Sequence, residues 1–520
     1  MVVSMRQKQV GRLARWRILA VTVTAILLFA AFPPLEWTAL VFVAWVPFSF
    51  AQVGAHRRVR DGLGGLMMGL LFGLLALSIN PPELVSGLQW VALALSIAVA
   101  VSLLATLLSL PLCSEQLISF LGPWARVWLP AIVWTGLDYL RLLTTAGHQW
   151  GMLGTTQIDV APLRAFLPIA GMWPVTLLTV ATGQALAVVT LVATRRLEYS
   201  RSLGLAIGVV AIGWLTGLGL AAWDAPPYTG RLRVAAVQPG DHVPTHPETV
   251  VFSTTRRYPE LTDAITTLHR PFTMTAGRQG AHLVVWPEAS GWVAPDDPAS
   301  KPQLHRVQQL AQEADVTIAW PYFIRIDPNR TRNELVLVTP QGYISPPTTK
   351  DHPVYVIGER SVTSGLAQTY VVQNIRIGLA AGPDGTYTDT FAHLASLGAE
   401  IVAVPTHDWE SFTAQHIRHL RVRAAEHRIA VVKADWRYGS AIIEPSGRII
   451  AASLTRERRP DLLVADVPVS KPGTLYTVTG DWMGVLALAI LFVTTIVSIG
   501  PRVFAALLNG EARVSLKPPR

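Results

Sequence analysis

The feature that most limits what this chain can fold into is a series of long apolar runs. Each run is close to the ~20 residues that an α-helix needs to cross the hydrocarbon core of a bilayer. The core of a soluble protein would not need apolar segments of this length and continuity. The runs predict a polytopic α-helical membrane protein. We expect its helices at residues 16–32, 37–51, 63–78, 88–110, 124–140, 165–193, 203–223 and 482–499.

Charge indicates the orientation of these helices. Only 15% of the 520 residues are charged, and the net charge is +9. The basic residues lie mainly beside the apolar runs, so we expect no nucleic-acid partner. They precede the first run and follow the second, sixth and last runs, which places them all on one side of an eight-helix protein. By the positive-inside rule that side is cytoplasmic. We therefore expect a multi-pass protein of the cell (inner or plasma) membrane.

The chain contains a single cysteine, Cys113. This excludes a disulfide framework and a cysteine-based metal site, and we expect neither a metal nor a cofactor. The N-terminus is basic and then apolar, like a signal peptide. No small-residue cleavage site ends the run, so we interpret it as an uncleaved first helix.

Residues 231–477 differ in character, because charge rises and short β-branched runs alternate with amphipathic stretches. Such alternation predicts an α/β domain of stacked layers. Since it follows the seventh helix, this domain should be extracytoplasmic. The expected organisation is a membrane domain of about seven helices at 1–223, the α/β domain at 224–477, an eighth helix at 478–500 and a cytoplasmic tail at 501–520. Strands are expected at 232–237, 283–286, 316–323, 334–338, 375–380, 401–405, 430–434 and 440–444, and helices at 301–313, 388–397 and 412–426.

Two charged residues of this domain could take part in acid–base chemistry. Glu288 follows a buried strand in the sequence Val-Val-Trp-Pro-Glu-Ala, where a carboxylate beside an aromatic side chain suits a general base. Lys350 could stabilise a developing oxyanion as a fixed positive charge. Taken singly, Glu288 is better explained as a solvated loop acid, and Lys350 as a surface lysine.

Other polar patterns are weaker signals. Arg423 and Glu426 are spaced as a helix-surface pair. His416 and His419 could face one metal ion, but no third ligand completes a site, so solvated helix histidines are the better interpretation. The segment 405–409 follows a strand, as a ligand-contacting loop or an ordinary turn would.

Taken in order along the chain, these motifs resemble one family. Trp286-Pro-Glu288, Arg332-Asn333, Lys350 with Gly358-Glu359, Thr406-His-Asp-Trp409 and Arg423-Ala-Ala-Glu426 resemble segments of a nitrilase (carbon–nitrogen hydrolase) domain. With Asp138-Tyr-Leu-Arg141 and Trp150-Gly-Met-Leu-Gly154 before them, the whole chain resembles the apolipoprotein N-acyltransferase family. The resemblance implies an α-β-β-α fold for the outer domain.

The resemblance also implies a reaction. In the family, a cysteine takes an acyl group from a membrane phospholipid as a thioester and passes it to the N-terminal cysteine of a lipoprotein. Glu288 would be the base, Lys350 would stabilise the oxyanion, and Glu359 would support Lys350. Substrate-binding positions by the same resemblance are Trp286, Asp384, His407, Asp408 and Trp409.

The nucleophile is where this chain departs from the family. The resemblance aligns Gly382 with the family's cysteine, and Pro383 and Asp384 replace an aromatic residue and a glutamate. Cys113 is expected at the cytoplasmic end of the fourth helix, on the other side of the bilayer from Glu288. The hydroxyls of Ser361, Ser364, Thr386 and Tyr387 are nearby in sequence, but none is at the corner. Residues 433–438 also differ from the family, which suggests a changed groove.

Three hypotheses follow. The chain could be a catalytically silent homologue, a pseudoenzyme, that still binds phospholipid or a lipoprotein N-terminus. It could be an N-acyltransferase with an unconventional mechanism. It could also be a non-enzymatic scaffold for a partner membrane enzyme. We favour the first, because the nucleophile is missing while Glu288 and Lys350 are present. The counter-interpretation is that these two survive as a buried ion pair that orders the fold.

Overall fold

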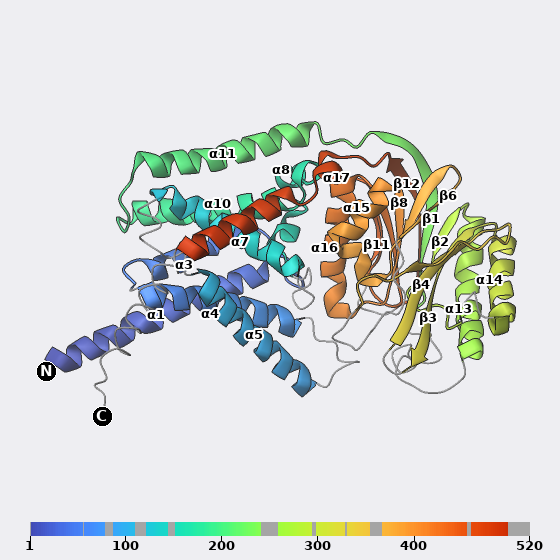
Figure 1. Cartoon of the computed structure of the whole chain (residues 1–520), viewed down its shortest axis with the longest axis horizontal. Helices are drawn as coiled ribbons and strands as arrows, with labels where there is room; N and C mark the ends of the chain where they lie inside the picture. Colours follow the sequence, from blue (N-terminus) through green and yellow to red (C-terminus); the bar gives the residue numbers. More distant parts are fainter. Residues whose placement is uncertain are drawn as a thin grey trace, which may run out of the picture.

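A computed structural model of the chain forms the basis of the following description. It describes residues 2–55, 57–78, 87–109, 121–143, 151–240, 258–293, 298–327, 330–353, 367–454 and 459–497. Cys113, Glu359, Ser361 and Ser364 lie outside these ranges. The chain has two parts, a bundle of helices and an α/β sandwich, which lie end to end (Figure 1).

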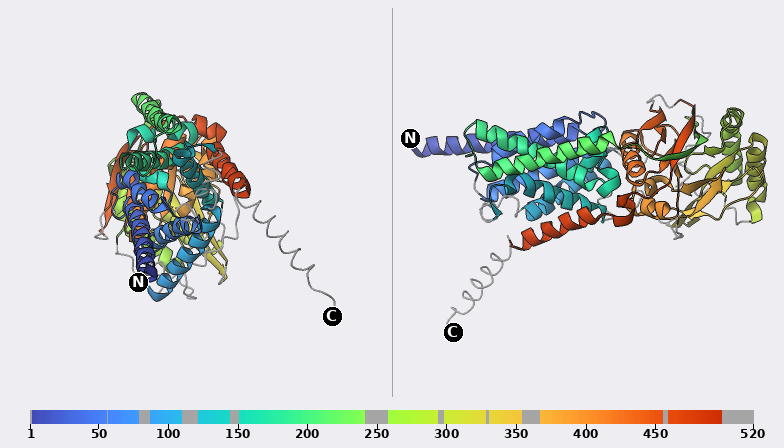
Figure 2. Two further views of the ribbon diagram at one scale, coloured as in Figure 1. Left: turned by 90° about the vertical axis from the view of Figure 1, so that its left-hand side faces the viewer. Right: turned by 90° about the horizontal axis from the view of Figure 1, so that it is seen from above.

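The helical part is an up-and-down bundle whose core is formed by apolar residues from most of its helices. The start of α1 lies at the end of the bundle remote from the sandwich (Figure 2). The helices are α1 (Val2–Ala30), α2 (Leu40–Val43), α3 (Trp45–Gln52), α4 (Arg57–Ser78), α5 (Gly87–Ser109), α7 (Ala125–Leu142), α8 (Ala161–Arg164), α9 (Leu167–Ala170), α10 (Trp173–Ala193) and α11 (Arg201–Ala222), with a last helix at Trp482–Val497.

Two of the expected long helices are interrupted. The second apolar run forms α2 and α3, and the sixth, which follows the short α8, forms α9 and α10. Helix α9 ends before Gly171, whose φ of 69° is in the left-handed region. Helices α9 and α10 each carry a proline in the first turn. Proline lacks an amide donor and therefore starts helices rather than continuing them.

Among the described residues, two helices are long and apolar enough to cross a membrane, α10 and α11. Several shorter apolar helices lie beside them, including 62–78 and the last helix. The eight-helix topology and the extracytoplasmic position of the sandwich remain predictions.

The α/β part contains two six-stranded sheets. The first has the strand order β12-β1-β2-β3-β4-β5 and the second β11-β10-β9-β8-β7-β6. The strands are β1 (Tyr228–Gln238), β2 (Leu283–Val285), β3 (Thr317–Asp327), β4 (Arg330–Val338), β5 (Thr348–Thr349), β6 (Thr369–Val372), β7 (Ile375–Leu379), β8 (Ile401–Thr406), β9 (Ala430–Asp435), β10 (Ser440–Ile443), β11 (Ile449–Ser453) and β12 (Asp461–Ser470).

The two sheets pack face to face and each is covered by helices on its outer face. One apolar core lies between the sheets, with Leu283 and Val285 facing Ile377 and Ala403. A second lies under α13 (Tyr258–Arg278) and α14 (Lys301–Ala314). A third lies under α15 (Thr388–Ser396) and α16 (Glu410–His427). The four layers form the expected α-β-β-α sandwich.

Helix α16 is shared by the two parts of the molecule and lies between the second sheet and the bundle (Figure 1). On one face, Leu420 and Ala424 belong to the core under the second sheet. On the other face, Val422 and Ala425 belong to the core of the bundle. The sandwich and the bundle therefore meet through a continuously packed layer.

Close packing in the bundle depends on small residues. A Cβ built on Gly217 of α11 would overlap the main-chain carbonyl of Pro162 in α8, whereas a Cβ on Gly208 of the same helix would have no atom within 4 Å. The absence of a side chain at Gly217 thus lets the two backbones touch.

This contrast gives a prediction with a matched control. Gly217→Ala overpacks the contact with α8 and should destabilise the protein by about 1–3 kcal/mol. Gly208→Ala should be neutral or slightly stabilising, because alanine is favoured over glycine in a helix by up to about 1 kcal/mol. Thermal unfolding of both variants in detergent measures the difference, and equal midpoints would contradict the proposed contact.

Candidate functional site

Glu288 lies just beyond β2, where the two sheets come together. Its amide donates to the carbonyl of Thr406 at the end of β8 (3.3 Å). Its own carbonyl accepts a 2.6 Å hydrogen bond from the indole of Trp436, which follows β9. The residue is 8% exposed. Glu288 is therefore a buried carboxylate anchored by both sheets, and it is not a solvated loop acid.

Lys350 and Asn333 share one oxygen of this carboxylate. The Lys350 ammonium lies 3.0 Å from Glu288 Oε1, and the Asn333 side-chain amide donates to the same atom at 2.6 Å. The Lys350 amide also donates to the carbonyl of Asn333 (2.9 Å). The structure thus brings together the two charged residues that were singled out in the sequence. Asn333 was noted only as part of a motif; its place in the site depends on strand pairing, which the sequence does not display.

Gly382 is the third element of the site. It opens the short 3-10 helix Gly382–Thr386 directly after β7 and has a φ of 51°, in the left-handed region. A Cβ on this residue would lie 2.8 Å from Glu288 Oε2 and 3.1 Å from Oε1. Gly382 therefore faces the Glu288 carboxylate directly.

Asp384 ties the Gly382 turn to the segment that carries Lys350. Its carboxylate accepts hydrogen bonds from the amides of Asp351 (2.9 Å) and His352 (2.8 Å) and lies 3.0 Å from His352 Nδ1. The ring of Tyr387 stacks on the His352 ring at a centroid distance of 3.6 Å. Asp384 was expected to bind substrate. In this structure its oxygens are engaged by backbone amides and the His352 ring, and only 2% of the residue is exposed, so contact with substrate stays a prediction.

His352 is a charged member of this connection. Burial lowers the pKa of His352, but its hydrogen bonds and charge interactions with Asp384 and Asp389 outweigh burial and raise the pKa from 6.5 to about 9. The imidazolium form is therefore favoured near neutral pH.

The His352 connection predicts a pH dependence of stability. Because the folded pKa is raised, the stabilisation is complete below pH 6.5 and is lost as the pH rises towards about 9. His352→Gln should lose this part of the alkaline decline. Thermal unfolding as a function of pH measures it, with Lys301→Gln on α14 as a surface control. Identical pH profiles for wild type and His352→Gln would contradict the assignment.

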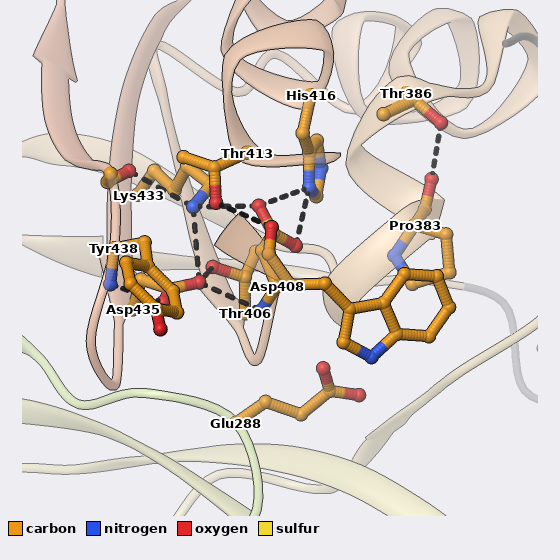
Figure 3. Close-up of polar contacts among 12 residues, drawn as sticks. Glu288, Pro383, Thr386, Thr406, Asp408, Thr413, His416, Lys433, Asp435 and Tyr438 are labelled. Atoms are coloured by element: carbon orange, nitrogen blue, oxygen red, sulfur yellow. Dashed lines mark hydrogen bonds and ion pairs between the residues drawn. The ribbon is translucent and has the colours of Figure 1, made fainter. Parts of the chain in front are cut away.

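A second buried network lies beside Glu288 (Figure 3). The Lys433 ammonium lies between two carboxylates, 3.0 Å from Asp408 and 3.2 Å from Asp435. Asp408 also contacts His416 Nδ1 at 2.9 Å, and Asp435 accepts from the Thr406 hydroxyl at 2.6 Å. These contacts join the ends of β8 and β9 to α16.

The charges in this network support one another. Burial raises the pKa of Asp408, but His416 and Lys433 outweigh it and hold the pKa below its usual range. Burial lowers the pKa of Lys433, whereas Asp408 and Asp435 raise it, with a net rise. Asp408 was expected to contact substrate. In this structure its carboxylate is held by His416 and Lys433, which fixes the loop 407–409 that carries His407 and Trp409, and its contact with substrate stays a prediction.

Other sequence expectations need correction. Trp286 was expected to bind substrate, which stays a prediction; its indole is fully buried, donates to the Thr273 hydroxyl and packs in the core. His416 and His419 were interpreted as solvated, yet each is only 1% exposed. Within the described residues, no group of three or more histidine, cysteine, aspartate or glutamate side chains is placed to hold a metal ion.

The Arg423–Glu426 pair was interpreted as a surface pair. Both side chains are completely buried, because α16 is covered by the bundle on the face where they lie. Thr386, one possible substitute nucleophile, donates its hydroxyl to the carbonyl of Pro383 at 2.7 Å. The expected roles of Glu359, Ser361 and Ser364 concern residues that the structure does not describe.

Comparison with known proteins agrees with this architecture. The profile of the apolipoprotein N-acyltransferase N-terminal domain matches residues 24–185, and that of the carbon–nitrogen hydrolases matches residues 233–474. The sandwich, with its Glu288–Lys350 pair, is therefore a nitrilase-superfamily domain. The chain belongs to the apolipoprotein N-acyltransferase family.

Individual relatives are distant. A hydrolase of Mycobacterium tuberculosis is 27% identical over 231 residues, covering 37% of this chain and 80% of the relative. The apolipoprotein N-acyltransferase of Photobacterium profundum is 28% identical over 159 residues, covering 31% of this chain and 27% of the relative. Apolipoprotein N-acyltransferase 1 of Treponema denticola is 33% identical over 119 residues, covering 20% and 21%. A mutant of the Nesterenkonia AN1 amidase superposes with a TM-score of 0.36 at 19% identity, covering 47% of this chain and 93% of the amidase.

Proposed function

We propose that this chain is a membrane-bound member of the family that binds an acylated lipid ligand, either a phospholipid or a lipoprotein N-terminus, without forming the family's thioester. The resemblance aligns Gly382 with the nucleophilic cysteine, and the single cysteine of the chain, Cys113, is far from the sandwich in sequence. Without a thiol, the covalent step of the family reaction has no acyl acceptor.

The observation that carries this proposal is the approach of Glu288 to Gly382. A Cβ at Gly382 would stand 2.8 Å from Glu288 Oε2, which is closer than ordinary van der Waals contact. The carboxylate thus occupies space that a nucleophilic side chain would need. Lys350 and Asn333 hold its other oxygen, Oε1, so Oε2 has to swing aside for any side chain placed at this position. The site is organised for a glycine.

The presence of Glu288 and Lys350 favours a groove that still binds a ligand over one that has lost its ligand. A buried carboxylate–ammonium pair is costly to maintain and contributes little net stability by itself. A fixed ammonium in a site shielded from water is well suited to contact the carbonyl oxygen of an ester. The proposed ligand is therefore an acyl ester or an acylated amine, with its carbonyl near Lys350.

The outer surface of α11 supports insertion in a membrane. Apolar side chains recur along one face of this helix, and each is at least half exposed. They are Leu205 (72%), Val209 (50%), Ile212 (60%), Leu215 (66%) and Leu218 (54%). Such a helix is stable when lipid covers this face. With the basic residues on the cytoplasmic side, the proposed orientation puts the sandwich outside the cytoplasm.

Acyl capture tests the proposal at Gly382. Purified wild type, Gly382→Cys and Gly382→Ala are incubated with phospholipid and analysed by intact mass before and after hydroxylamine, which cleaves thioesters. We expect an acyl adduct on Gly382→Cys alone. The alanine variant is the matched control, since it introduces the same Cβ and the same left-handed strain of about 1–2 kcal/mol without the thiol.

The same preparations also test for turnover and for binding. N-acylation of a diacylated lipopeptide by wild type would overturn the silent assignment and indicate an unconventional mechanism. Lipid that co-purifies with wild type should decrease in the double variant Glu288→Gln/Lys350→Met, which removes both charges of the pair. Absence of co-purifying lipid from wild type, and of an adduct on Gly382→Cys, would favour a scaffold for a partner membrane enzyme.

Orientation is tested separately by labelling single cysteines in a Cys113→Ser background. Glu313→Cys lies on the sandwich and Glu198→Cys on the basic loop after α10, and both native side chains are exposed. A membrane-impermeant maleimide added to intact cells should label the first and spare the second. The reverse pattern would contradict the proposed orientation.

A further inference from the structure

Glu426, near the C-terminal end of α16, reaches from the sandwich into the bundle. Its Oε1 accepts a 2.9 Å hydrogen bond from the main-chain amide of Met172. Met172 immediately precedes α10, a helix of 21 residues. The first amides of a helix lack partners within it, and they carry the positive end of its dipole. A side chain of the sandwich thus caps a helix of the bundle.

A second carboxylate lies at the same helix end. Asp481, just before the last helix, accepts from the indole of Trp173 at 2.7 Å and from the hydroxyl of Tyr476. Its other oxygen accepts from the Thr388 hydroxyl of α15 at 3.2 Å. The start of α10 therefore meets carboxylates from two different segments of the chain.

One guanidinium contacts Glu426. Arg423 lies one helical turn before Glu426, with its Nη1 2.9 Å from Glu426 Oε2, and neither side chain is exposed. If Glu426 is ionised, the carboxylates of Glu426 and Asp481 share one neighbouring positive charge, and Glu426 itself is completely buried. If Glu426 is protonated, the charges of Arg423 and Asp481 balance, and Glu426 Oε1 still accepts from Met172. An uncompensated buried charge is unfavourable.

We propose that Glu426 is a proton-binding joint between the α/β sandwich and the helical bundle. With its proton bound, the seam between α16 and α10 is closed; loss of the proton loosens the seam. This inference does not depend on the proposed function, because it concerns a contact remote in sequence from Gly382 and Lys350.

The titration of Glu426 supports this mechanism. Burial raises its pKa, Arg423 opposes the rise and Asp481 adds to it, with the result that the pKa moves from 4.5 to about 8. A raised pKa in the closed state means that the contribution to stability is complete below pH 4.5 and is lost as the pH rises towards 8. The opening equilibrium then increases by up to about tenfold per pH unit.

Two other titratable groups at the seam restrict the useful pH range. Burial lowers the pKa of His427 from 6.5 to about 3, with Arg423 adding to the effect. His427 therefore destabilises the closed state below pH 6.5 and is silent above it. Burial and nearby Glu426 raise the pKa of Tyr476 well above 10, so it stays neutral. Of Glu426, His427 and Tyr476, Glu426 is the one that changes charge between pH 6.5 and 8.

Hydrogen exchange measured by mass spectrometry tests the joint in the full-length protein. Protection of amides at the start of α10 and the end of α16, corrected for intrinsic exchange rates, should fall by up to about tenfold per pH unit from pH 6.5 to 8. Helix α13, on the far side of the sandwich, serves as an internal control and should show no such fall. Constant protection at the seam in wild type would overturn the proposal.

Glu426→Gln provides a matched variant. The amide oxygen still accepts from Met172, but the side chain cannot ionise, so seam protection should not change with pH. Glu313→Gln, at an exposed ion pair with Arg270, should behave as wild type. A seam that loosens equally in wild type and Glu426→Gln would disprove the role of this residue. The wild-type exchange experiment decides the question even if the variant is unstable. The stabilisation contributed by His352 also declines in this pH range. His352 lies at the Gly382 turn, however, and is present in both wild type and Glu426→Gln.

Discussion

The buried negative charge of Glu288 is the constraint on which the rest of the site depends. A carboxylate at the junction of two sheets must be paired and hydrogen-bonded, because an isolated buried charge is very unfavourable. Lys350 and Asn333 meet this need from β4 and from the segment after it, while main-chain contacts to Thr406 and Trp436 fix the residue on the other sheet. The relative position of the two sheets, and with it the position of Gly382, is thus tied to one carboxyl group.

The same principle recurs around the site. Asp384 gathers two amides and the His352 ring, and Lys433 is held by two carboxylates and a carbonyl. These contacts join chain segments that are distant in sequence, which rigidifies the loops at the strand ends. Loops that carry functional groups usually need such support from beneath. Among the described residues of this chain, such contacts surround a corner that is occupied by a glycine, Gly382.

The sequence predicted the layered α/β domain, because strand–helix alternation is a local property, whereas the ion pair of Glu288 with Lys350 entered only as a counter-interpretation. The sequence did not predict α13, which contains Pro271, or the edge strands β6, β11 and β12, whose apolar pattern is weak. The burial of His416, Arg423 and Glu426 was also missed. Each is a polar residue on an amphipathic helix, and from sequence alone its polar face was assigned to solvent. Their burial results from tertiary packing, which the sequence does not display: α16 is covered on one face by the second sheet and on the other by the bundle.

The shared position of α16 has a consequence for the order in which the protein is assembled. The bundle helices up to α11 are synthesised first, yet part of their core consists of Val422 and Ala425, which follow some 200 residues later in the sequence. The last helix then packs so closely on α7 that a Cβ at Gly136 would stand 2.8 Å from the carbonyl of Ala487. Until both segments have arrived, the early helices expose apolar surface that has no protein partner. During synthesis, this surface must be covered by lipid or by the insertion machinery, and an excised sandwich would carry the complementary exposed face of α16.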